Sequence, residues 1–243
     1  MSATHLVLFD IDGTLLSSAA SGRDAIHAAF AEVLDDLAPL EGVRFDGKTD
    51  PQIVRELYAA AGRELDATPE RITALLERYV DHLERTLAQR AGQVRPLPGI
   101  VALLDALERR ADVCLGLLTG NVSRGAALKL GAAGLDIARF RLGAYGSDHA
   151  HRPALPAIAV ERAAAVMGHR PVGHRVVIIG DTPADVTCGQ GIGARAVGVA
   201  TGWYSGEQLA AAGAHAVFER FDDVEEAIGA IVSDGAAVTG DAA

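Results

Sequence analysis

The chain has 243 residues, of which 49% are hydrophobic and 22% are charged, as in an ordinary globular protein. This length is sufficient for one α/β domain with a smaller inserted domain. The net charge of -10 at pH 7 disfavours nucleic acid as a partner, because an acidic chain gains no affinity by neutralising a phosphate backbone. A small anionic ligand would therefore need a local positive site.

The sequence predicts neither a targeting segment nor a membrane span. The start, MSATHLVLFD, lacks a basic region followed by a long apolar core. We find no uncharged apolar stretch of about 20 residues, so we expect no membrane partner and a cytoplasmic location. Cys114 and Cys188 lie in strand-like and helix-like runs, which favours two buried thiols over a disulfide.

Short apolar runs alternate with helical patterns over much of the chain. Runs of strand-forming residues occupy 4–9, 113–118, 175–179 and 195–199. Helical patterns occupy 99–110, 122–133, 153–167 and 183–189. Runs that are apolar throughout are typical of buried parallel strands, and their alternation with helices predicts crossover connections. The expected fold class is α/β, with a doubly wound, Rossmann-like parallel sheet.

Residues 17–95 interrupt this alternation. Helical patterns follow one another there, at about 22–37, 51–62 and 69–90. We found no convincing strand pattern between them. The segment RPLPG at 95–99 then marks the return to alternating strands and helices.

We therefore expect two domains. The α/β core would consist of residues 1–16 and 96–232, and an all-helical cap domain would consist of residues 17–95. The small, polar residues 233–243 are expected to form a disordered tail.

Polar residues directly follow three of the predicted strands. They are Asp10, Asp12 and Gly13 after the first, Thr119, Gly120 and Asn121 after the second, and Asp181 and Asp185 after a later one. The carboxyl ends of parallel strands lie at one edge of a sheet, where ligands bind. These residues are therefore expected to converge.

The convergence of several carboxylates predicts a metal site. At ~4 Å and an effective dielectric of ~20, each pair of carboxylates costs about 4 kcal/mol. A hard divalent ion offsets that repulsion, and Mg²⁺ suits it because Mg²⁺ uses few carboxylates together with substrate phosphate. The predicted cofactor is Mg²⁺, with four candidate ligands: Asp10, Asp12, Asp181 and Asp185.

The loops at the same edge are suited to phosphate. Gly13 allows a sharp turn and a close backbone approach to a ligand. Thr119, Gly120 and Asn121 open a helix, whose free N–H groups favour phosphate oxygens. Two other interpretations remain open at this point: Asn121 as a helix cap, and Asp185 as part of a capping box.

These motifs resemble those of the haloacid-dehalogenase superfamily. The first motif, Asp-x-Asp-Gly-Thr, matches Asp10 to Thr14, and the second, a strand that ends in Thr or Ser, matches Thr119. The fourth, Gly-Asp followed by another Asp, matches Asp181 and Asp185. The resemblance spans Leu6 to about Asp223, and the helical insert is similar to the cap of the phosphoglycolate-phosphatase-like group.

The resemblance implies a role for each residue. Asp10 would be the nucleophile that forms an aspartyl-phosphate, and Asp12 would protonate the leaving alcohol and then deprotonate water. Mg²⁺ would contact the Asp10 side chain, the Asp12 carbonyl and Asp181. Thr119 and the Gly120 amide would bind phosphate, and Asp185 would lie behind the metal ligands or orient the basic residue.

The third motif departs from the family pattern, which usually has a Lys. The corresponding segment is His151-Arg152-Pro153, and Arg152 is our candidate for the basic catalytic and phosphate-binding role. The alternative is Lys129, which lies two turns inside its helix and is expected to face outward.

The expected function is Mg²⁺-dependent hydrolysis of a small phosphomonoester, with a small phosphorylated metabolite as partner. A sugar-phosphate phosphomutase and a catalytically silent phosphate-binding or scaffolding protein are the alternatives. Dehalogenation needs no metal and no acid at position 12, so the carboxylates argue against it. The sequence names neither the substrate nor the oligomeric state.

Two weaker patterns lie outside these motifs. Arg23 and the segment Lys48-Thr49-Asp50 are near predicted helix starts in the insert, and each is a candidate for contact with a second anionic group of the substrate. Trp203 and Tyr204 follow a predicted strand and are expected to pack on the core.

Overall fold

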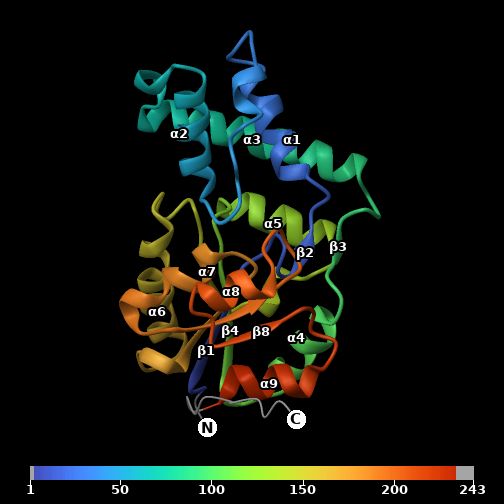
Figure 1. Cartoon of the computed structure of the whole chain (residues 1–243), viewed down its shortest axis with the longest axis vertical. Coiled ribbons are helices and arrows are strands. Elements are labelled where there is room, and N and C mark those ends of the chain that lie inside the picture. Colours follow the sequence, from blue (N-terminus) through green and yellow to red (C-terminus); the bar gives the residue numbers. More distant parts are fainter. Residues whose placement is uncertain (1–2, 234–243) are drawn as a thin grey trace.

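The computed structural model describes residues 3–233 and is built on a six-stranded sheet (Figure 1). All neighbouring strands are parallel, in the order β5-β4-β1-β6-β7-β8. The strands are β1 (His5–Phe9), β4 (Val113–Leu118), β5 (Leu142–Ala144), β6 (Val176–Gly180), β7 (Arg195–Val199) and β8 (Ala216–Phe218). The four predicted strands are confirmed as β1, β4, β6 and β7. The runs of β5 and β8 were not predicted, and each has only three residues.

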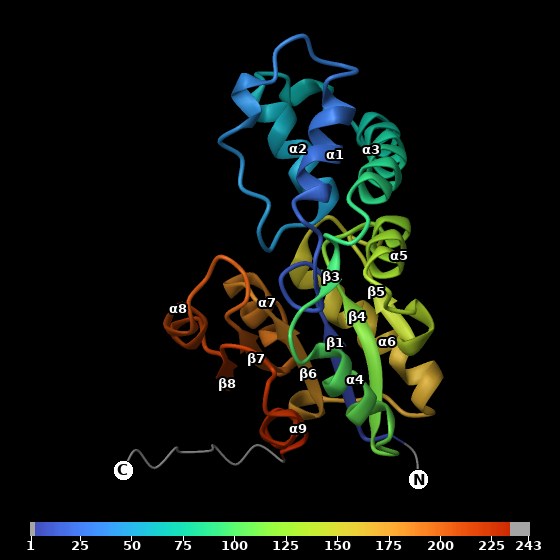
Figure 2. The ribbon, with the colours of Figure 1, turned by 90° about the vertical axis from the view of Figure 1, so that its right-hand side faces the viewer.

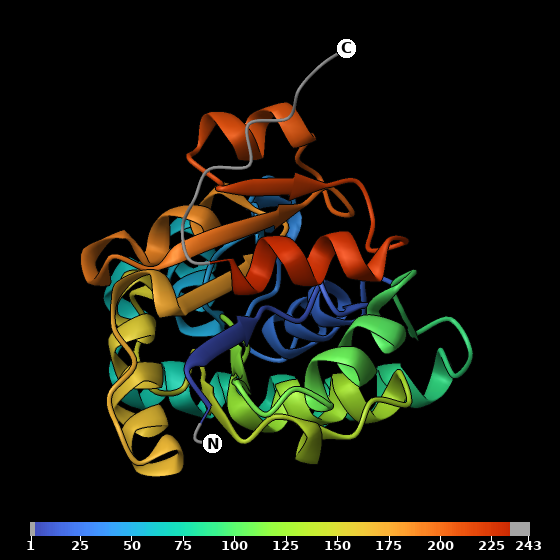
Figure 3. The same cartoon turned by 90° about the horizontal axis from the view of Figure 1, so that it is seen from below.

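Helices cover both faces of the sheet, which confirms the doubly wound α/β class. On one face lie α4 (Ile100–Glu108), α5 (Ser123–Ala132) and α9 (Val224–Val232); on the other lie α6 (Leu155–Met167), α7 (Pro183–Cys188) and α8 (Gly206–Ala211). Figure 3 shows α4 and α9 on one side of the strands and α6 on the other.

Strand β1 lies in the middle of the sheet and is buried on both faces. Val7 and Phe9 pack in the core cluster of one face, whereas Leu6 and Leu8 pack in that of the other. All four side chains are 0% exposed, which explains why this run is apolar throughout and does not alternate. Cys114 and Cys188 are buried free thiols, as predicted.

The chain between β1 and β4 forms three long helices beyond the carboxyl ends of the strands (Figures 1 and 2). They are α1 (Ser21–Phe30), α2 (Asp50–Ala60) and α3 (Pro69–Gln89). A short antiparallel pair, β2 (Leu16–Ser17) and β3 (Arg95–Pro96), joins the two ends of this helical segment. In both views α5 lies next to α3, so the helical segment sits over the sheet edge where the predicted site residues end.

The ends of these helices follow local capping chemistry. Thr49 and Thr68 cap α2 and α3, because each hydroxyl accepts a hydrogen bond from a backbone amide in the first turn. Helix α1 ends at Phe30, seven residues before the predicted end at 37. The side chain of Asp36 accepts a hydrogen bond from the Ala38 amide at 2.9 Å and starts a separate 3₁₀ turn instead.

Three other expectations concern membrane spans, the C-terminal tail and the division into domains. No helix within residues 3–233 is long and apolar enough to cross a membrane. Most of the predicted disordered tail, from residue 234 onward, lies outside the described residues. The division into core and cap at residues 17–95 remains a prediction.

Gly99 occupies a position at which the fold requires glycine. It precedes α4 with φ of 79°, and a Cβ there would lie 2.0 Å from the backbone oxygen of Phe221. We predict that Gly99→Ala lowers the free energy of unfolding by about 2–4 kcal/mol, through left-handed strain and this clash. Urea unfolding measures the change.

The control is Gly131→Ala on the exposed side of α5, where a Cβ meets nothing within 4 Å. That substitution is expected to stabilise the protein by about 0.5–1 kcal/mol. Equal effects of the two substitutions would contradict the close approach at Gly99.

Candidate active site

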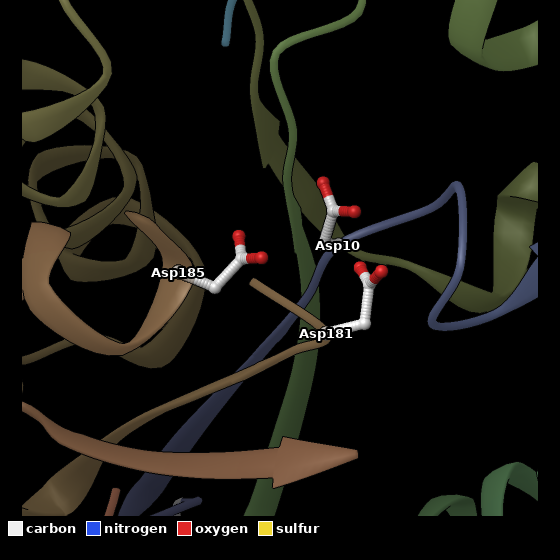
Figure 4. Close-up of side chains that lie close together, drawn as sticks. All are labelled: Asp10, Asp181 and Asp185. Carbon is white, nitrogen blue, oxygen red and sulfur yellow. The ribbon is translucent and has the colours of Figure 1, made fainter. Parts of the chain in front are cut away.

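Three buried carboxylates meet at the carboxyl edge of the sheet (Figure 4). Asp10 directly follows β1, Asp181 directly follows β6, and Asp185 lies in the first turn of α7. One oxygen from each lies within 4.8 Å of the others, and the three residues are at most 7% exposed. The predicted convergence of these residues is therefore confirmed.

The cluster has the electrostatics of a cation site. Burial and the neighbouring Asp185 carboxylate raise the pKa of Asp10 to about 7. Burial, followed by the same neighbour, raises the pKa of Asp181 well above its ordinary value. A divalent cation among these oxygens would reverse both shifts, because it favours the charged carboxylates. Three converging carboxylate oxygens fit the preference of Mg²⁺ for oxygen ligands.

Two glycines let the backbone close around Asp181. A Cβ on Gly13, where φ is 80°, would lie 2.3 Å from Oδ2 of Asp181, and one on Gly202 would lie 1.8 Å from the same atom. Thr14 donates a hydrogen bond to Oδ1 of Asp181 at 3.3 Å. The backbone at Gly13 therefore comes close to this carboxylate, and its approach to a ligand stays a prediction.

Arg152 is the cation that the structure places in the cluster. It lies in a 3₁₀ turn at the start of α6 and is 4% exposed. Its Nη2 donates to Asp10 at 3.0 Å and also to Asp185. Within the described part of the chain its Nε is buried and has no hydrogen-bond partner. The positive charge of this guanidinium, which borders the cavity, is suited to an anionic ligand.

Asp185 combines the two roles that the sequence left open. Its carboxylate accepts hydrogen bonds from the Thr182 amide at 3.0 Å and the Thr182 hydroxyl at 2.6 Å, which completes a capping box. The other oxygen of this carboxylate accepts from Arg152. The cap thus fixes the carboxylate that orients Arg152.

The carboxylate of Asp12 lies outside this cluster. Its Oδ2 accepts from Lys129 Nζ at 2.6 Å and from the Asn121 amide nitrogen at 2.9 Å, and its Oδ1 accepts from the Ser18 hydroxyl at 2.6 Å. Burial alone would raise the pKa of Asp12, but the Lys129 ammonium and these hydrogen bonds lower it. Only the backbone carbonyl of Asp12 is left for the predicted metal contact.

The expectation that Lys129 faces outward is wrong. Lys129 is 4% exposed and also donates to Oδ1 of Asn121. The reason is its position in α5, where Ala126, Lys129 and Leu130 share the buried face. The spacing from Ala126 would have given this signal, since residues three apart lie on the same side of a helix.

In the loop after β4, the side chain of Asn121 and the backbone of Gly120 have different kinds of contact. Asn121 does not cap α5, because the N-cap is Val122, and the Asn121 side chain contacts Asp12 and Thr119. The capping interpretation is therefore wrong. Gly120 accepts the Asp50 amide at 2.8 Å through its carbonyl, and no protein acceptor among residues 3–233 contacts its own amide. That amide is free for an anion.

A cavity of about 390 Å³ lies between the sheet edge and the helical segment. Its walls come from both parts of the chain and include Asp10, Asp12, Thr119, Arg152, Asp181, Arg23, Phe45, Lys48, Tyr79 and Trp203. The expectation that Trp203 packs on the core is wrong, because its side chain is 81% exposed beside this cavity. Ser18 was missed as a site residue, since nothing in its local sequence places it opposite the strand ends. Asp50 was a candidate for contact with an anionic group, whereas its carboxylate accepts a hydrogen bond from the Val122 amide.

Comparison with known proteins gives the family. Residues 4–193 match the haloacid dehalogenase-like hydrolase family, and this match covers more than half of the chain. The chain belongs to the haloacid dehalogenase-like hydrolases. The resemblance inferred from Asp10, Thr119, Asp181 and Asp185 is confirmed.

Similar proteins are phosphatases or hydrolases. A phosphoglycolate phosphatase of Rhodospirillum rubrum is 32% identical over 92% of this chain and 90% of its own length. A probable phosphatase, IndB, of Dickeya dadantii is 31% identical over 93% of this chain and 94% of its own. A hydrolase from Pseudomonas syringae has a similar structure, with a TM-score of 0.71, 24% identity and coverage of 94% and 99%. The predicted enzyme class, a phosphoric monoester hydrolase, is confirmed.

Asp50 supports a prediction about pH. It is 6% exposed, its Oδ2 accepts from the Val122 amide at 2.7 Å, and burial raises its pKa from 3.8 to about 6. Between these values the folded protein holds a proton that the unfolded chain has released, so this group lowers stability as pH rises through the window. We predict that Asp50→Asn stabilises the protein at pH 7 by about 2–3 kcal/mol.

At pH 3.5 the same substitution is expected to give almost no gain, because Asp50 is then protonated in the folded state and largely protonated in the unfolded chain. Urea unfolding at both pH values measures the difference, and Asp35→Asn, at an exposed position, is the control. The same gain at both pH values would contradict the buried carboxylate.

Arg152 supports a prediction about metal and stability. We predict that Arg152→Met lowers the free energy of unfolding by about 3 kcal/mol without metal, because two buried carboxylates lose their cation. Added Mg²⁺ should restore part of this loss, since it neutralises the same carboxylates. Arg170→Met, which breaks an exposed pair with Glu161, should cost less than about 1 kcal/mol. An equal response to Mg²⁺ in both variants would contradict the shared site.

Proposed function

We propose that this protein hydrolyses a small phosphomonoester through an aspartyl-phosphate on Asp10, with Mg²⁺ as its cofactor. One observation carries the proposal: the buried Asp10 carboxylate lies where an acidic cluster, the Arg152 guanidinium and the loop after β4 meet. A nucleophile, a cation site and unused donors in one cavity are what phosphoryl transfer requires.

The first half-reaction would form a bond between an Asp10 oxygen and phosphorus and break the bond from phosphorus to the leaving oxygen. Asp12 would give that oxygen its proton. The pKa of Asp12 is lowered in the absence of substrate, and an anionic substrate nearby would raise it toward the value an acid needs. In the second half-reaction water would attack phosphorus, Asp12 would take the proton, and Asp10 would be released.

Other residues would hold the transferring phosphoryl group. The Arg152 guanidinium, the Gly120 amide and the Thr119 hydroxyl, all in the cavity wall, are the proposed donors. Side chains of Asp10 and Asp181, with the Asp12 carbonyl, would hold Mg²⁺, and Asp185 would keep Arg152 in place. When bound, Mg²⁺ would supply positive charge that opposes the phosphate charge.

The helical segment would act as the cap. It supplies part of the cavity wall, and its Thr49 donates to the Ala150 carbonyl at 2.6 Å while the Asp50 amide donates to Gly120. These bonds hold the start of α2 against the catalytic loops. A closed cap would exclude water and choose the substrate.

Phosphoglycolate is the first substrate to test, because the Rhodospirillum rubrum relative is a phosphoglycolate phosphatase. The alternatives have distinct outcomes. A phosphomutase would form an isomer of a sugar phosphate faster than it releases phosphate. A silent binding protein would bind the ester without turnover, and the contact of Arg152 with Asp10 argues against that alternative.

We predict that phosphate release from a panel of phosphomonoesters requires Mg²⁺ and stops when EDTA is added. Asp10→Asn should lower kcat by about 1,000-fold or more, because the nucleophile is lost. Asp105→Asn, an exposed carboxylate on α4, should retain full activity. Phosphate release that persists in Asp10→Asn would contradict the proposed role of Asp10 as the nucleophile.

A further inference from the structure

Arg23 is a cation in the cavity wall without an acidic partner. Three other basic residues line the cavity, and each forms an ion pair: Lys48 with Glu56, Lys129 with Asp12, and Arg152 with Asp10 and Asp185. Within residues 3–233, no carboxylate oxygen lies within ion-pair distance of Arg23. A positive charge left unpaired in a ligand cavity is available to an anion.

The guanidinium of Arg23 is held in place without being neutralised. Its Cζ lies 4.4 Å from the centroid of the Phe45 ring, and its Nη1 donates to the Val43 carbonyl at 3.4 Å. Both contacts orient the group, and neither removes its charge. An arginine ordered in advance loses less conformational entropy when it binds a ligand.

The backbone around Arg23 adds further donors. Arg23 lies in the first turn of α1, whose N-cap residue, Ala20, offers no side-chain cap. No protein acceptor in the described part of the chain contacts the amides of Gly22 and Arg23. Free amides at a helix start favour a negative group.

This end of α1 lies close to the proposed acid–base residue. A Cβ on Gly22 would be 3.1 Å from Lys129 Nζ, and that nitrogen lies 2.6 Å from Oδ2 of Asp12. Asp12 is the group proposed to protonate the leaving oxygen. In the proposed mechanism the first turn of α1 would therefore lie on the leaving-group side of the cavity, and Arg152 on the phosphoryl side.

We propose that Arg23 and the first-turn amides of α1 bind a second anionic group, a carboxylate or a phosphate, on the leaving group of the substrate. This rests on the proposed phosphatase function and narrows it. The substrate class becomes small phosphomonoesters with a second negative group near the ester oxygen. Selection would come from charge pairing on the helical segment, separate from the phosphoryl site.

The test compares esters that differ in the second anion alone. One pair is 2-phosphoglycolate and ethyl phosphate, and the other is 1,3-propanediol bisphosphate and propyl phosphate. For wild type we expect a higher kcat/KM for the dianionic member of at least one pair. Arg23→Gln should reduce that preference by about 10- to 100-fold, with less than about a 3-fold change for the ester without a second anion.

The ratio of kcat/KM values is measured on one enzyme sample, so partial misfolding of a variant lowers both values and leaves the ratio intact. Arg78→Gln on α3 is the matched control, because Arg78 pairs with Glu32 and lies outside the wall of the catalytic cavity. It should keep the wild-type preference. The pair that responds to Arg23→Gln identifies the anion as carboxylate or phosphate.

Binding separates this proposal from the proposed function. In an Asp10→Asn background, calorimetry gives the Kd of 2-phosphoglycolate and 1,3-propanediol bisphosphate and of their partner esters, with and without Arg23→Gln. If wild type hydrolyses none of the esters, the phosphatase proposal fails, and the Kd ratios still decide on the anion site. The site is overturned if Arg23→Gln weakens both members of each pair equally or leaves all four unchanged.

Discussion

The carboxylates of Asp10, Asp181 and Asp185 have oxygens within 4.8 Å of one another and repel strongly because they are buried. The surrounding residues reduce that repulsion only in part. Arg152 supplies one positive charge, and the remaining excess appears as the raised pKa values of Asp10 and Asp181. The fold creates this problem, because parallel strands bring their carboxyl ends to one edge. Acidic side chains at this edge of the sheet favour a bound cation, and a bound cation in turn favours a phosphate beside it.

Charge also divides the cavity into two parts. Around Asp10, a cation and the free amide of Gly120 are suited to the phosphoryl group. Around Asp12, the carboxylate is already satisfied by Lys129, Asn121 and Ser18, which keeps it ionised without help from a metal. Two carboxylates separated by one residue therefore have pKa values shifted in opposite directions, raised for Asp10 and lowered for Asp12. A nucleophile and a general acid need the reverse, which the proposed cation beside Asp10 and an anionic substrate beside Asp12 would supply.

The sequence predicted the site residues whose positions depend on the ends of strands. It missed contacts that depend on how helices pack. Asp10, Thr119 and Asp181 follow strands that are apolar throughout, so their convergence depends on topology alone. Lys129 was misjudged because a lysine is normally exposed, whereas here its helix turns it inward to a partner more than 100 residues away. The site residues of the helical segment had no motif, since their positions depend on how that segment lies over the sheet.

A close backbone approach between the helical segment and the loop after β4 also restricts how the two parts can be exchanged between related enzymes. A Cβ on Gly120 would lie 2.0 Å from the Lys48 carbonyl oxygen, so the two backbones touch where position 120 has no side chain. A chimaera that joins this sheet to the helices of a relative would need the same bare contact. A transfer of the helical segment between such enzymes therefore depends on glycine at position 120 as well as on the residues that touch the substrate.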